Sequence, residues 1–236
     1  LWQKTEQQKQ IVDLFKLRLT YLAGLFDWVR LDHAKGFYFY GAMNPTNPAK
    51  DLVKTGPGSK ILEPILDHCR KISLKIFAED SGDRLKGLRR TLTKYKTSGI
   101  RVFRYSLMTT KQPGIHTRYA NLAKYPKSCL AISSTYDTET LMDYLNKLTA
   151  GQCRQLAFHT KTRFDPDRQV FAQRLRQAII DSPAFISLIS MQDWLLTTDR
   201  INIPGTETET ADPNWRYQLK IPIEELPIRP ILQAVR

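Results

Sequence analysis

The amino-acid sequence predicts an α/β fold in which parallel strands alternate with helices. Five short runs rich in apolar and β-branched residues recur along the 236 residues. Segments of helical length, with apolar side chains at three- and four-residue spacing, connect most of these runs. Because strand-helix-strand units place their strands parallel in one sheet, two architectures fit: an open doubly wound sheet or part of a (β/α)8 barrel.

A third observation favours the barrel. Open dinucleotide-binding sheets carry a G-x-G-x-x-G turn after an early strand, whereas Asp32-His33-Ala34-Lys35-Gly36 follows the first strand here. A partial barrel is expected, because five strands cannot close a barrel of eight. Hydrophobic residues make up 42% of the chain and aromatic residues 10%, which excludes disorder as its main state.

The first hundred residues are expected to begin with a helix over 7–24, where apolar side chains recur at helical spacing and Gly24 is a plausible stop. Residues 26–31 are predicted to form a strand, and residues 34–58, rich in Asn-Pro and Gly-Pro steps, a loop. Ser59 is expected to cap the next helix. The remaining predictions here are a helix with the apolar face Ile61, Leu62, Ile65, Leu66 and Cys69, a strand over 73–78, and a helix marked by Leu85, Leu88, Leu92 and Tyr95.

The alternation continues in the second half. Strands are predicted over 100–105, 128–133 and 184–190, helices over 141–148 and 167–180, and an ordered loop from Asn202 onward.

The charge is strongly basic. The formal net charge is +13, and from Arg84 to Tyr136 there are twelve Lys and Arg but no carboxylate. We interpret the stretch 84–136 as a solvated basic face, with a polyanion-binding surface as the alternative. No zinc-finger spacing or glycine-aromatic RNA motif accompanies it, so a nucleic-acid partner is not expected.

Cysteine usage and hydropathy indicate the compartment. Three cysteines, at positions 69, 129 and 153, show neither a disulfide framework nor metal spacing, so a reducing compartment, the cytoplasm, is expected. The longest apolar runs are too short to span a bilayer, and no signal peptide is recognised, so no membrane partner is expected. The first residue is Leu1, which suggests a cleaved product or a fragment.

Carboxylates stand just beyond the C-terminal ends of three predicted strands. Asp32 follows the first strand, Glu79 and Asp80 follow the second, and Asp137 follows the fourth. In parallel α/β folds this end of the sheet carries the chemistry. A single carboxylate here could cap a helix, but three together suggest acid/base or nucleophilic work on an uncharged substrate such as a glycoside. A divalent metal held by carboxylates is the other candidate.

Around these carboxylates the sequence resembles the 4-α-glucanotransferases, also called amylomaltases or disproportionating enzymes (glycoside hydrolase family 77). Residues 30–37 are similar to the family's R-x-D-H-x-x-G-F, residues 78–82 to A-E-D-L-G, and residues 134–140 to G-T-H-D-N-D-T. Further segments that resemble family motifs, in the family's order, are 54–58, 98–103, 191–195, 200–206 and 214–216.

The resemblance implies that residues 1–236 form the C-terminal half of the family's catalytic barrel, about strands 4–8. The N-terminal barrel strands would be missing, and the missing half of the same protein would be a partner of this chain. A half-barrel by itself has unpaired sheet edges and exposed apolar surface, so the isolated chain is expected to self-associate or to fold poorly.

The resemblance also implies a reaction. Family members transfer α-1,4-glucan segments between maltooligosaccharides by a retaining double displacement, without metal or organic cofactor. By this analogy Asp32 is the nucleophile, Glu79 is the general acid/base, and Asp137 holds the hydroxyl groups of the distorted sugar. Arg30 would pair with Asp32 and keep it ionised.

Three residues depart from the family motifs. Tyr136 replaces the histidine that contacts substrate, so weaker transition-state binding is expected. Ser81 replaces the leucine of A-E-D-L-G, and Ser134 replaces a glycine, both at positions that shape a loop. Arg30, His33, Tyr136 and Asn202 are the expected substrate-binding residues, although His33 could serve a structural hydrogen bond instead.

Three other functions remain open from the sequence. The chain could be a degenerate family member that binds glucan with weak or no turnover, which Tyr136 motivates. It could bind a polyanion through residues 84–136. It could also be a hydrolase related to the α-amylases, in which water rather than sugar accepts the glycosyl unit.

Overall fold

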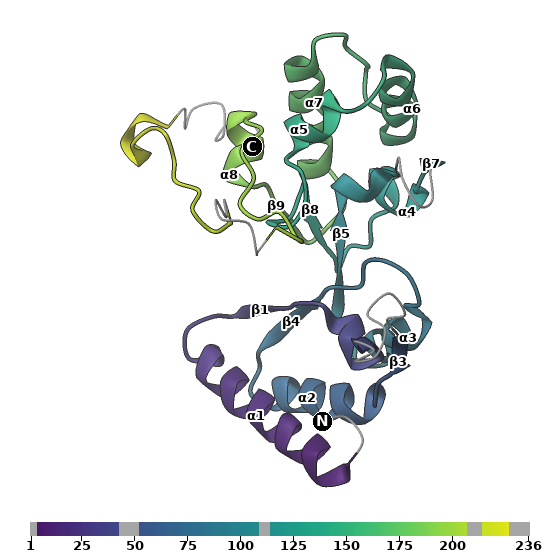
Figure 1. Ribbon diagram of the computed structural model, residues 1–236, viewed down its shortest axis with the longest axis vertical. Coiled ribbons are helices and arrows are strands. Elements are labelled where there is room, and N and C mark those ends of the chain that lie inside the picture. Colours follow the sequence, from purple (N-terminus) through teal and green to yellow (C-terminus); the bar gives the residue numbers. More distant parts are fainter. Residues whose placement is uncertain (1–3, 43–51, 109–113, 207–213, 227–236) are drawn as a thin grey trace. The chain divides into compact units, whose positions relative to one another are not determined.

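The computed structural model describes residues 4–42, 52–108, 114–206 and 214–226 (Figure 1). The chain divides into two compact units, Leu1–Ile100 and Arg101–Arg236, which are described separately. The predicted alternation of strands and helices is present in both units.

The first unit holds a parallel sheet covered by helices. Its main elements are α1 (Thr5–Ala23), β1 (Trp28–Leu31), α2 (Ser59–Lys71), β4 (Lys75–Ala78), α3 (Lys86–Lys94) and β5 (Ser98–Val102), whose last two residues begin the second unit. β1 pairs in parallel with β4, which pairs in parallel with β5. Helices α1 and α2 lie against each other (Figure 1).

The predicted apolar face of α2 is confirmed. Its five side chains, from Ile61 to Cys69, are all buried, and they form one core with Leu88 and Leu92 of α3. A core of this kind holds the parallel strands in register, because each strand buries its own apolar face against the same helices.

The expectation that residues 34–58 form a loop is wrong for much of the segment. A 3-10 helix, η1 (Ala34–Phe37), precedes an antiparallel pair of strands, β2 (Phe39–Ala42) and β3 (Leu52–Thr55). The two Asn-Pro steps behind the loop prediction, at 44–45 and 47–48, lie outside the described residues. Aromatic and β-branched residues on either side of them are what strands favour.

Gly58, not Ser59, caps α2. Ser59 is the first residue of the helix, and Gly58 before it has a φ of 59° and lies against the ring of Tyr38. A side chain at Gly58 would meet that ring at about 2.9 Å as well as a strained backbone, so the turn requires glycine.

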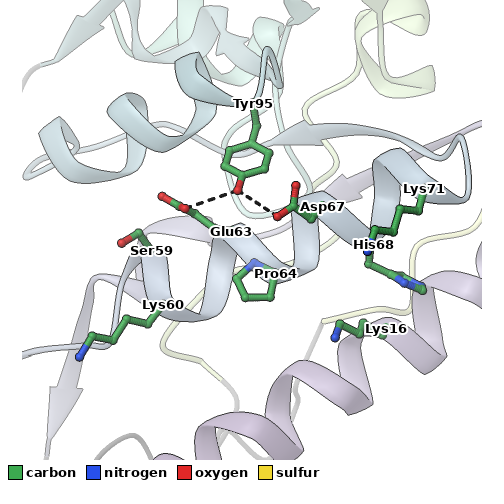
Figure 2. A pocket seen from close by; sticks show the side chains of 9 residues that line it. All are labelled: Lys16, Ser59, Lys60, Glu63, Pro64, Asp67, His68, Lys71 and Tyr95. Carbon is green, nitrogen blue, oxygen red and sulfur yellow. Dashed lines mark hydrogen bonds between the residues drawn. The ribbon is translucent and has the colours of Figure 1, made fainter.

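A surface hollow with a volume of about 500 Å³ lies between α1, α2 and Tyr95 (Figure 2). The Tyr95 hydroxyl lies 3.1 Å from Asp67 Oδ2 and 3.4 Å from Glu63 Oε2, and it shares its single hydrogen between these two acceptors. None of the predicted site residues lines this hollow, which is formed by helix surfaces rather than by strand ends.

The second unit surrounds another parallel strand pair. Its longer elements are β8 (Leu130–Ile132), α5 (Leu141–Asn146), α6 (Ala150–Thr160), α7 (Arg168–Ile180), β9 (Ile186–Leu188) and α8 (Met191–Leu195). Short elements are η3 (Phe103–Ser106), β6 (Leu107–Met108), β7 (Gly114–Ile115), α4 (Thr117–Ala120), η4 (Leu122–Lys124) and η5 (Ile223–Glu225). β8 pairs in parallel with β9, and a core that includes Tyr144 and Phe171 packs beside β8.

Two differences from the predicted elements of this unit have a clear local reason. The strand expected over 100–105 ends at Val102, because the next residues turn into η3, where the Ser106 hydroxyl bonds to Phe103 O at 2.5 Å. The helix α6 was not expected. Its signal was a capping box, in which Thr149 accepts from Gln152 N while the Gln152 side chain accepts from Thr149 N.

Two general features concern the described part of the chain. No helix in it is long and apolar enough to cross a membrane. Nor are three or more His, Cys, Asp or Glu side chains grouped there as a metal ligand set.

Candidate active site

The ends of β1 and β4 place two predicted carboxylates side by side. Leu31 of β1 is in register with Ala78 of β4, and Asp32 and Glu79 are the residues that follow them. Neighbouring parallel strands end at the same edge of a sheet, so two residues at equivalent positions project from that edge together.

Arg30 and the His33 amide bridge these two carboxylates. Arg30 Nη2 lies 2.7 Å from Asp32 Oδ1 and 2.9 Å from Glu79 Oε2. The backbone N–H of His33 donates to the same two oxygens, at 3.0 Å each. His33 itself has a left-handed backbone, with φ 44°, and the chain turns there from the end of β1 into η1.

The shared nitrogen limits the separation of the carboxylates. Asp32 Oδ1 and Glu79 Oε2 both contact Arg30 Nη2. The distance between these two oxygens therefore cannot exceed the sum of the two contact distances. Retaining glycosidases have about 5–5.5 Å between their two carboxyl groups, and inverting ones about 6.5–9.5 Å. Two carboxylates whose facing oxygens share one guanidinium nitrogen are compatible with a retaining reaction, in which one carboxylate attacks the sugar directly.

His33 contacts the carboxylates through its backbone rather than its ring. The ring lies beside Gly36, where an added Cβ would be 2.9 Å from His33 Cδ2. This close approach explains why position 36 is a glycine. The His33 residue is exposed.

The structure separates the roles of Glu79 and Asp80. Asp80 is buried and accepts hydrogen bonds from Ile100 N at 3.0 Å and from Arg89 Nε at 3.3 Å. An added Cβ at Gly99 would lie 2.6 Å from its Oδ1. Asp80 thus anchors the end of β4 to β5, whereas Glu79 faces Arg30.

Ser81 contacts the second oxygen of Glu79. Its hydroxyl donates to Glu79 Oε1 at 2.8 Å, while Oε2 faces Arg30 and the His33 amide. The sequence indicated only that Ser81 departs from a family leucine. The hydrogen bond could have been suspected from its spacing, because residues two apart on an extended segment share a face.

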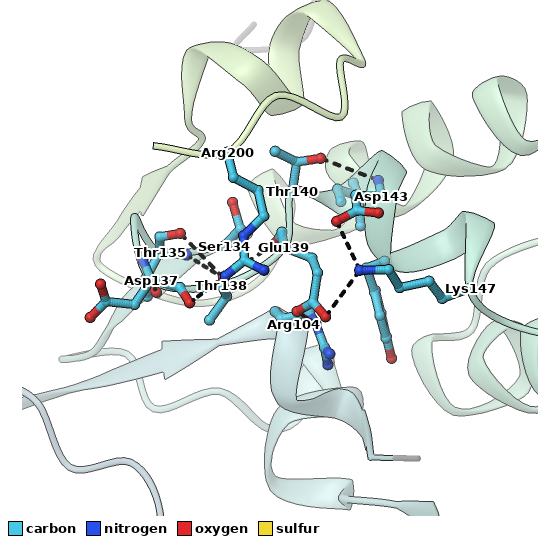
Figure 3. A network of polar contacts seen from close by, with 12 residues as sticks. Arg104, Ser134, Thr135, Asp137, Thr138, Glu139, Thr140, Asp143, Lys147 and Arg200 are labelled. Atoms are coloured by element: carbon cyan, nitrogen blue, oxygen red, sulfur yellow. Dashed lines mark hydrogen bonds and ion pairs between the residues drawn. The ribbon is translucent and has the colours of Figure 1, made fainter. Parts of the chain in front are cut away.

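Asp137 lies in the second unit, on the loop between β8 and α5, and has partners from the C-terminal segment. Asn202 Nδ2 donates to Asp137 Oδ1 at 2.6 Å. Arg200, which lies beside Asp137 in Figure 3, donates from Nη2 to the Asp137 carbonyl at 2.9 Å. Asn202 is only 8% exposed. Asn202 is therefore held away from solvent and positions the Asp137 carboxylate. Arg200 was not among the predicted site residues.

Tyr136 forms an aromatic pair with Trp215. The ring centroids are 5.2 Å apart with an interplanar angle of 41°. Backbone hydrogen bonds from Asn202 N to Tyr136 O and from Trp215 N to Ile201 O hold the two segments together. Trp215 is 66% exposed, so the pair presents an aromatic surface beside Asp137.

A buried carboxylate anchors the loop that carries Asp137. Asp193 of α8 is fully buried and accepts from Ser133 Oγ at 2.5 Å, Ser134 Oγ at 2.6 Å and Leu141 N at 2.6 Å. Ser134, a departure from the family's glycine, thus has a structural partner. Both ends of the loop are fixed to one residue, which lies in the family-like segment 191–195, although its contacts with this loop were not predicted.

Glu139 adds an ion pair to the same loop. Arg104 Nε lies 2.8 Å from Glu139 Oε2, and Lys147 Nζ lies 3.4 Å from its Oε1 (Figure 3). Burial alone would raise the pKa of Glu139, but the hydrogen bonds and the charge of Arg104 outweigh it and lower the pKa to about 2.

The basic stretch 84–136 is partly neutralised by carboxylates from elsewhere in the sequence. The pairs are Arg89 with Asp80, Lys94 with Glu63, and Arg104 with Glu139. Arg101 is buried. Some basic residues of the stretch 84–136 therefore form ion pairs within the fold.

Comparison with known proteins gives concordant matches. A family model described as 4-alpha-glucanotransferase (glycoside hydrolase family 77) matches residues 1–223. The chain is 25% identical over 212 residues to the chloroplastic/amyloplastic 4-alpha-glucanotransferase of Solanum tuberosum, covering 86% of this chain and 33% of that protein. It is 27% identical over 205 residues to the 4-alpha-glucanotransferase of Aquifex aeolicus, covering 83% and 38%. The chain thus spans about a third of the length of these curated relatives.

Two solved structures share the fold. The amylomaltase from Streptococcus agalactiae in complex with acarbose matches with a TM-score of 0.74 at 21% identity, covering 94% of this chain and 43% of that chain. The amylomaltase from Corynebacterium glutamicum matches with a TM-score of 0.67 at 16% identity, covering 94% and 37%. These matches confirm the predicted fold class, an α/β part of a (β/α)8 barrel.

Proposed function

The chain belongs to the 4-alpha-glucanotransferase family, glycoside hydrolase family 77, and from this premise we propose that it is the catalytic part of a retaining α-1,4-glucan transferase. The observation that carries the proposal is the pair Asp32 and Glu79, bridged by Arg30 at the ends of two neighbouring strands. Maltooligosaccharides are the proposed donors and acceptors.

The proposed reaction has two half-reactions. In the first, Asp32 attacks the anomeric carbon, while Glu79 protonates the glycosidic oxygen of the departing glucan. In the second, Glu79 takes the proton from a sugar hydroxyl of the acceptor, and that oxygen displaces Asp32. The single positive charge of Arg30 offsets part of the repulsion between the two adjacent carboxylates in the free site, which helps them to lie close together.

Asp137, Tyr136 and Trp215 are proposed to bind the sugar. The Asp137 carboxylate is exposed but fixed by Asn202, so it can accept hydrogen bonds from sugar hydroxyls without reorganising. The exposed ring of Trp215, supported by Tyr136, offers a flat apolar face of the kind on which pyranose rings stack.

Substrate binding without turnover is the second candidate, motivated by Tyr136 at the position of the family's histidine. The bridged carboxylate pair favours the transferase, because a retaining double displacement needs two carboxyl groups close together and sugar binding alone does not. A hydrolase differs only in its acceptor. The polyanion-binding alternative is weakened by the ion pairs that occupy part of the basic stretch.

The remainder of the family's barrel is the proposed partner of this chain, since the chain spans about a third of its curated relatives. We also place the protein in the cytoplasm, where the buried thiols of Cys69, Cys129 and Cys153 stay reduced.

The test is maltotriose disproportionation by the longest natural polypeptide that contains this sequence. Glucose and a ladder of longer maltooligosaccharides are expected from the unaltered protein. Asp32→Asn is expected to abolish the ladder, and Glu79→Gln to slow it by about 10²- to 10⁴-fold, the usual contribution of general acid–base catalysis.

Asp27→Asn is the matched control. Asp27 is an exposed carboxylate just before β1, at the end of the strand away from Asp32, so this variant is expected to keep full activity. Glucan binding with no products from the unaltered protein would favour the binding-only function. Glucose without longer products would identify a hydrolase.

A further inference from the structure

The two oxygens of Glu79 have chemically different partners. Oε2 accepts from the Arg30 guanidinium at 2.9 Å and from the His33 backbone amide at 3.0 Å. Oε1 accepts from the Ser81 hydroxyl at 2.8 Å. Each partner donates when Glu79 is ionised.

These partners respond differently when Glu79 gains a proton. A guanidinium and a backbone amide can only donate, so a proton on Oε2 would face two donors with no acceptor. A serine hydroxyl can donate or accept, and its hydrogen rotates freely about the Cβ–Oγ bond. Oε1 is therefore the oxygen on which a proton can be accommodated.

We propose that Ser81 is a positioning residue for Glu79, and that the proton which Glu79 transfers resides on Oε1, facing Ser81 Oγ. This inference rests on the proposed transferase function. In the first half-reaction, the proton leaves Oε1 for the glycosidic oxygen, and the Ser81 hydroxyl turns to donate to the carboxylate formed. In the second, Oε1 takes the acceptor's proton, and Ser81 turns again to accept.

The surroundings of Ser81 hold its oxygen in place. The residue is 8% exposed. Asp80 before it is anchored to Ile100 N and Arg89, and Gly82 after it has a φ of 91°. The Ser81 hydroxyl does not cap a helix, since α3 begins only at Lys86 and its N-cap residue is Leu85. The hydrogen bond to Glu79 is thus the polar role that the structure gives to Ser81.

The test compares two donor substrates in the longest natural polypeptide that contains this chain. Maltotriose has a poor leaving group and needs a proton from Glu79, whereas α-maltosyl fluoride releases fluoride with little need for one. Ser81→Ala is expected to lower kcat for maltotriose disproportionation by about 10- to 100-fold, the effect of one hydrogen bond to a charged group. The initial release of fluoride is expected to change by less than about threefold, because protonation contributes little to it.

Ser81→Thr is the conservative variant. It keeps the hydroxyl, so it is expected to retain maltotriose turnover within about threefold of the unaltered protein, since a threonine hydroxyl offers the same donor and acceptor. The fluoride reaction also reports that each variant is folded and that Asp32 is intact.

The possible outcomes distinguish the role of Ser81 from the transferase function itself. An active unaltered protein whose Ser81→Ala variant is equally active, or equally slowed on both donors, would overturn the role of Ser81 alone. So would a Ser81→Thr variant as slow as Ser81→Ala. An unaltered protein that processes neither donor would overturn the transferase function and the role of Ser81 with it.

Discussion

Individual side chains give each carboxylate of the candidate site its own surroundings. Asp32 and Glu79 share Arg30 and one backbone amide, whereas Asp137 is held by Asn202. The carboxylates were recognisable from the sequence by their place after strands. Their partners were only partly recognisable, because Asn202 is 65 residues away from Asp137 and Ser81 looks like an ordinary loop residue.

Tyr136 invites a gain-of-function experiment. A histidine at this position would be shorter and could donate from either ring nitrogen when protonated, so Tyr136→His is expected to raise kcat/KM for maltotriose by about 3- to 30-fold, roughly one added hydrogen bond in the transition state. Initial rates at several maltotriose concentrations would measure it.

Tyr136→Phe is the control for that experiment, because it keeps the ring against Trp215 but cannot supply the new hydrogen bonds. No gain is expected from it. A histidine variant that is no faster than the phenylalanine variant would show that Tyr136 does not limit turnover.

The strands and helices were largely predictable because their signals are local. The face of α2 is an example, since its buried residues recur every three or four positions. Elements were missed where neighbouring Asn-Pro steps indicated a loop, or where the element was too short to show a periodic pattern. The strands β2 and β3 flank two Asn-Pro steps, and α8 has only five residues, begun by a Ser190 cap that accepts from Asp193 N.

The loop between β8 and α5 gives a pH-dependent prediction. The folded pKa of Glu139, about 2, lies below its ordinary value of 4.5, so the ion pair stabilises the fold fully above about pH 4.5 and loses its effect as the pH falls toward 2. Glu139→Gln is expected to lower the unfolding free energy at pH 7 by about 1–3 kcal/mol, partly because it leaves the Arg104 guanidinium without its charge partner.

Urea unfolding at pH 7, 4 and 2.5 would measure the effect. The difference between Glu139→Gln and the unaltered protein is expected to shrink as the pH falls. Glu224→Gln, at an exposed position in η5, is the matched control and is expected to show a small, constant difference. A Glu139 difference that stays constant with pH would refute the proposed ion-pair contribution.

In the part that the structure describes, the first unit has an unpaired strand edge and an exposed apolar stripe. Within the described residues of the first unit, β1 pairs with β4 alone, so its other edge has no strand beside it. On α1, Leu14, Leu17 and Tyr21 are 54%, 70% and 71% exposed and follow one another at helical spacing. Exposed strand edges and apolar stripes both promote association.

The isolated 236-residue chain is therefore expected to self-associate. Sedimentation velocity over a range of concentrations would show it. Leu17→Lys is expected to reduce the association by placing a charge in the stripe, whereas Gln10→Lys, which adds the same charge at an already polar and exposed position of α1, is expected to have little effect. A monodisperse monomer with a sharp cooperative melt would contradict the expectation.

The alternation of strands and helices, the family, and the candidates Asp32, Glu79 and Asp137 follow from the sequence, because periodicity and motifs depend on residues close together along the chain. Tertiary structure decided the rest. It turned Asp80 into the sheet and Glu79 toward Arg30, and it brought Arg200 and Asn202 back to Asp137. Those contacts join residues distant in sequence, so they form only when packing sets the register of the strands and the path of the loops.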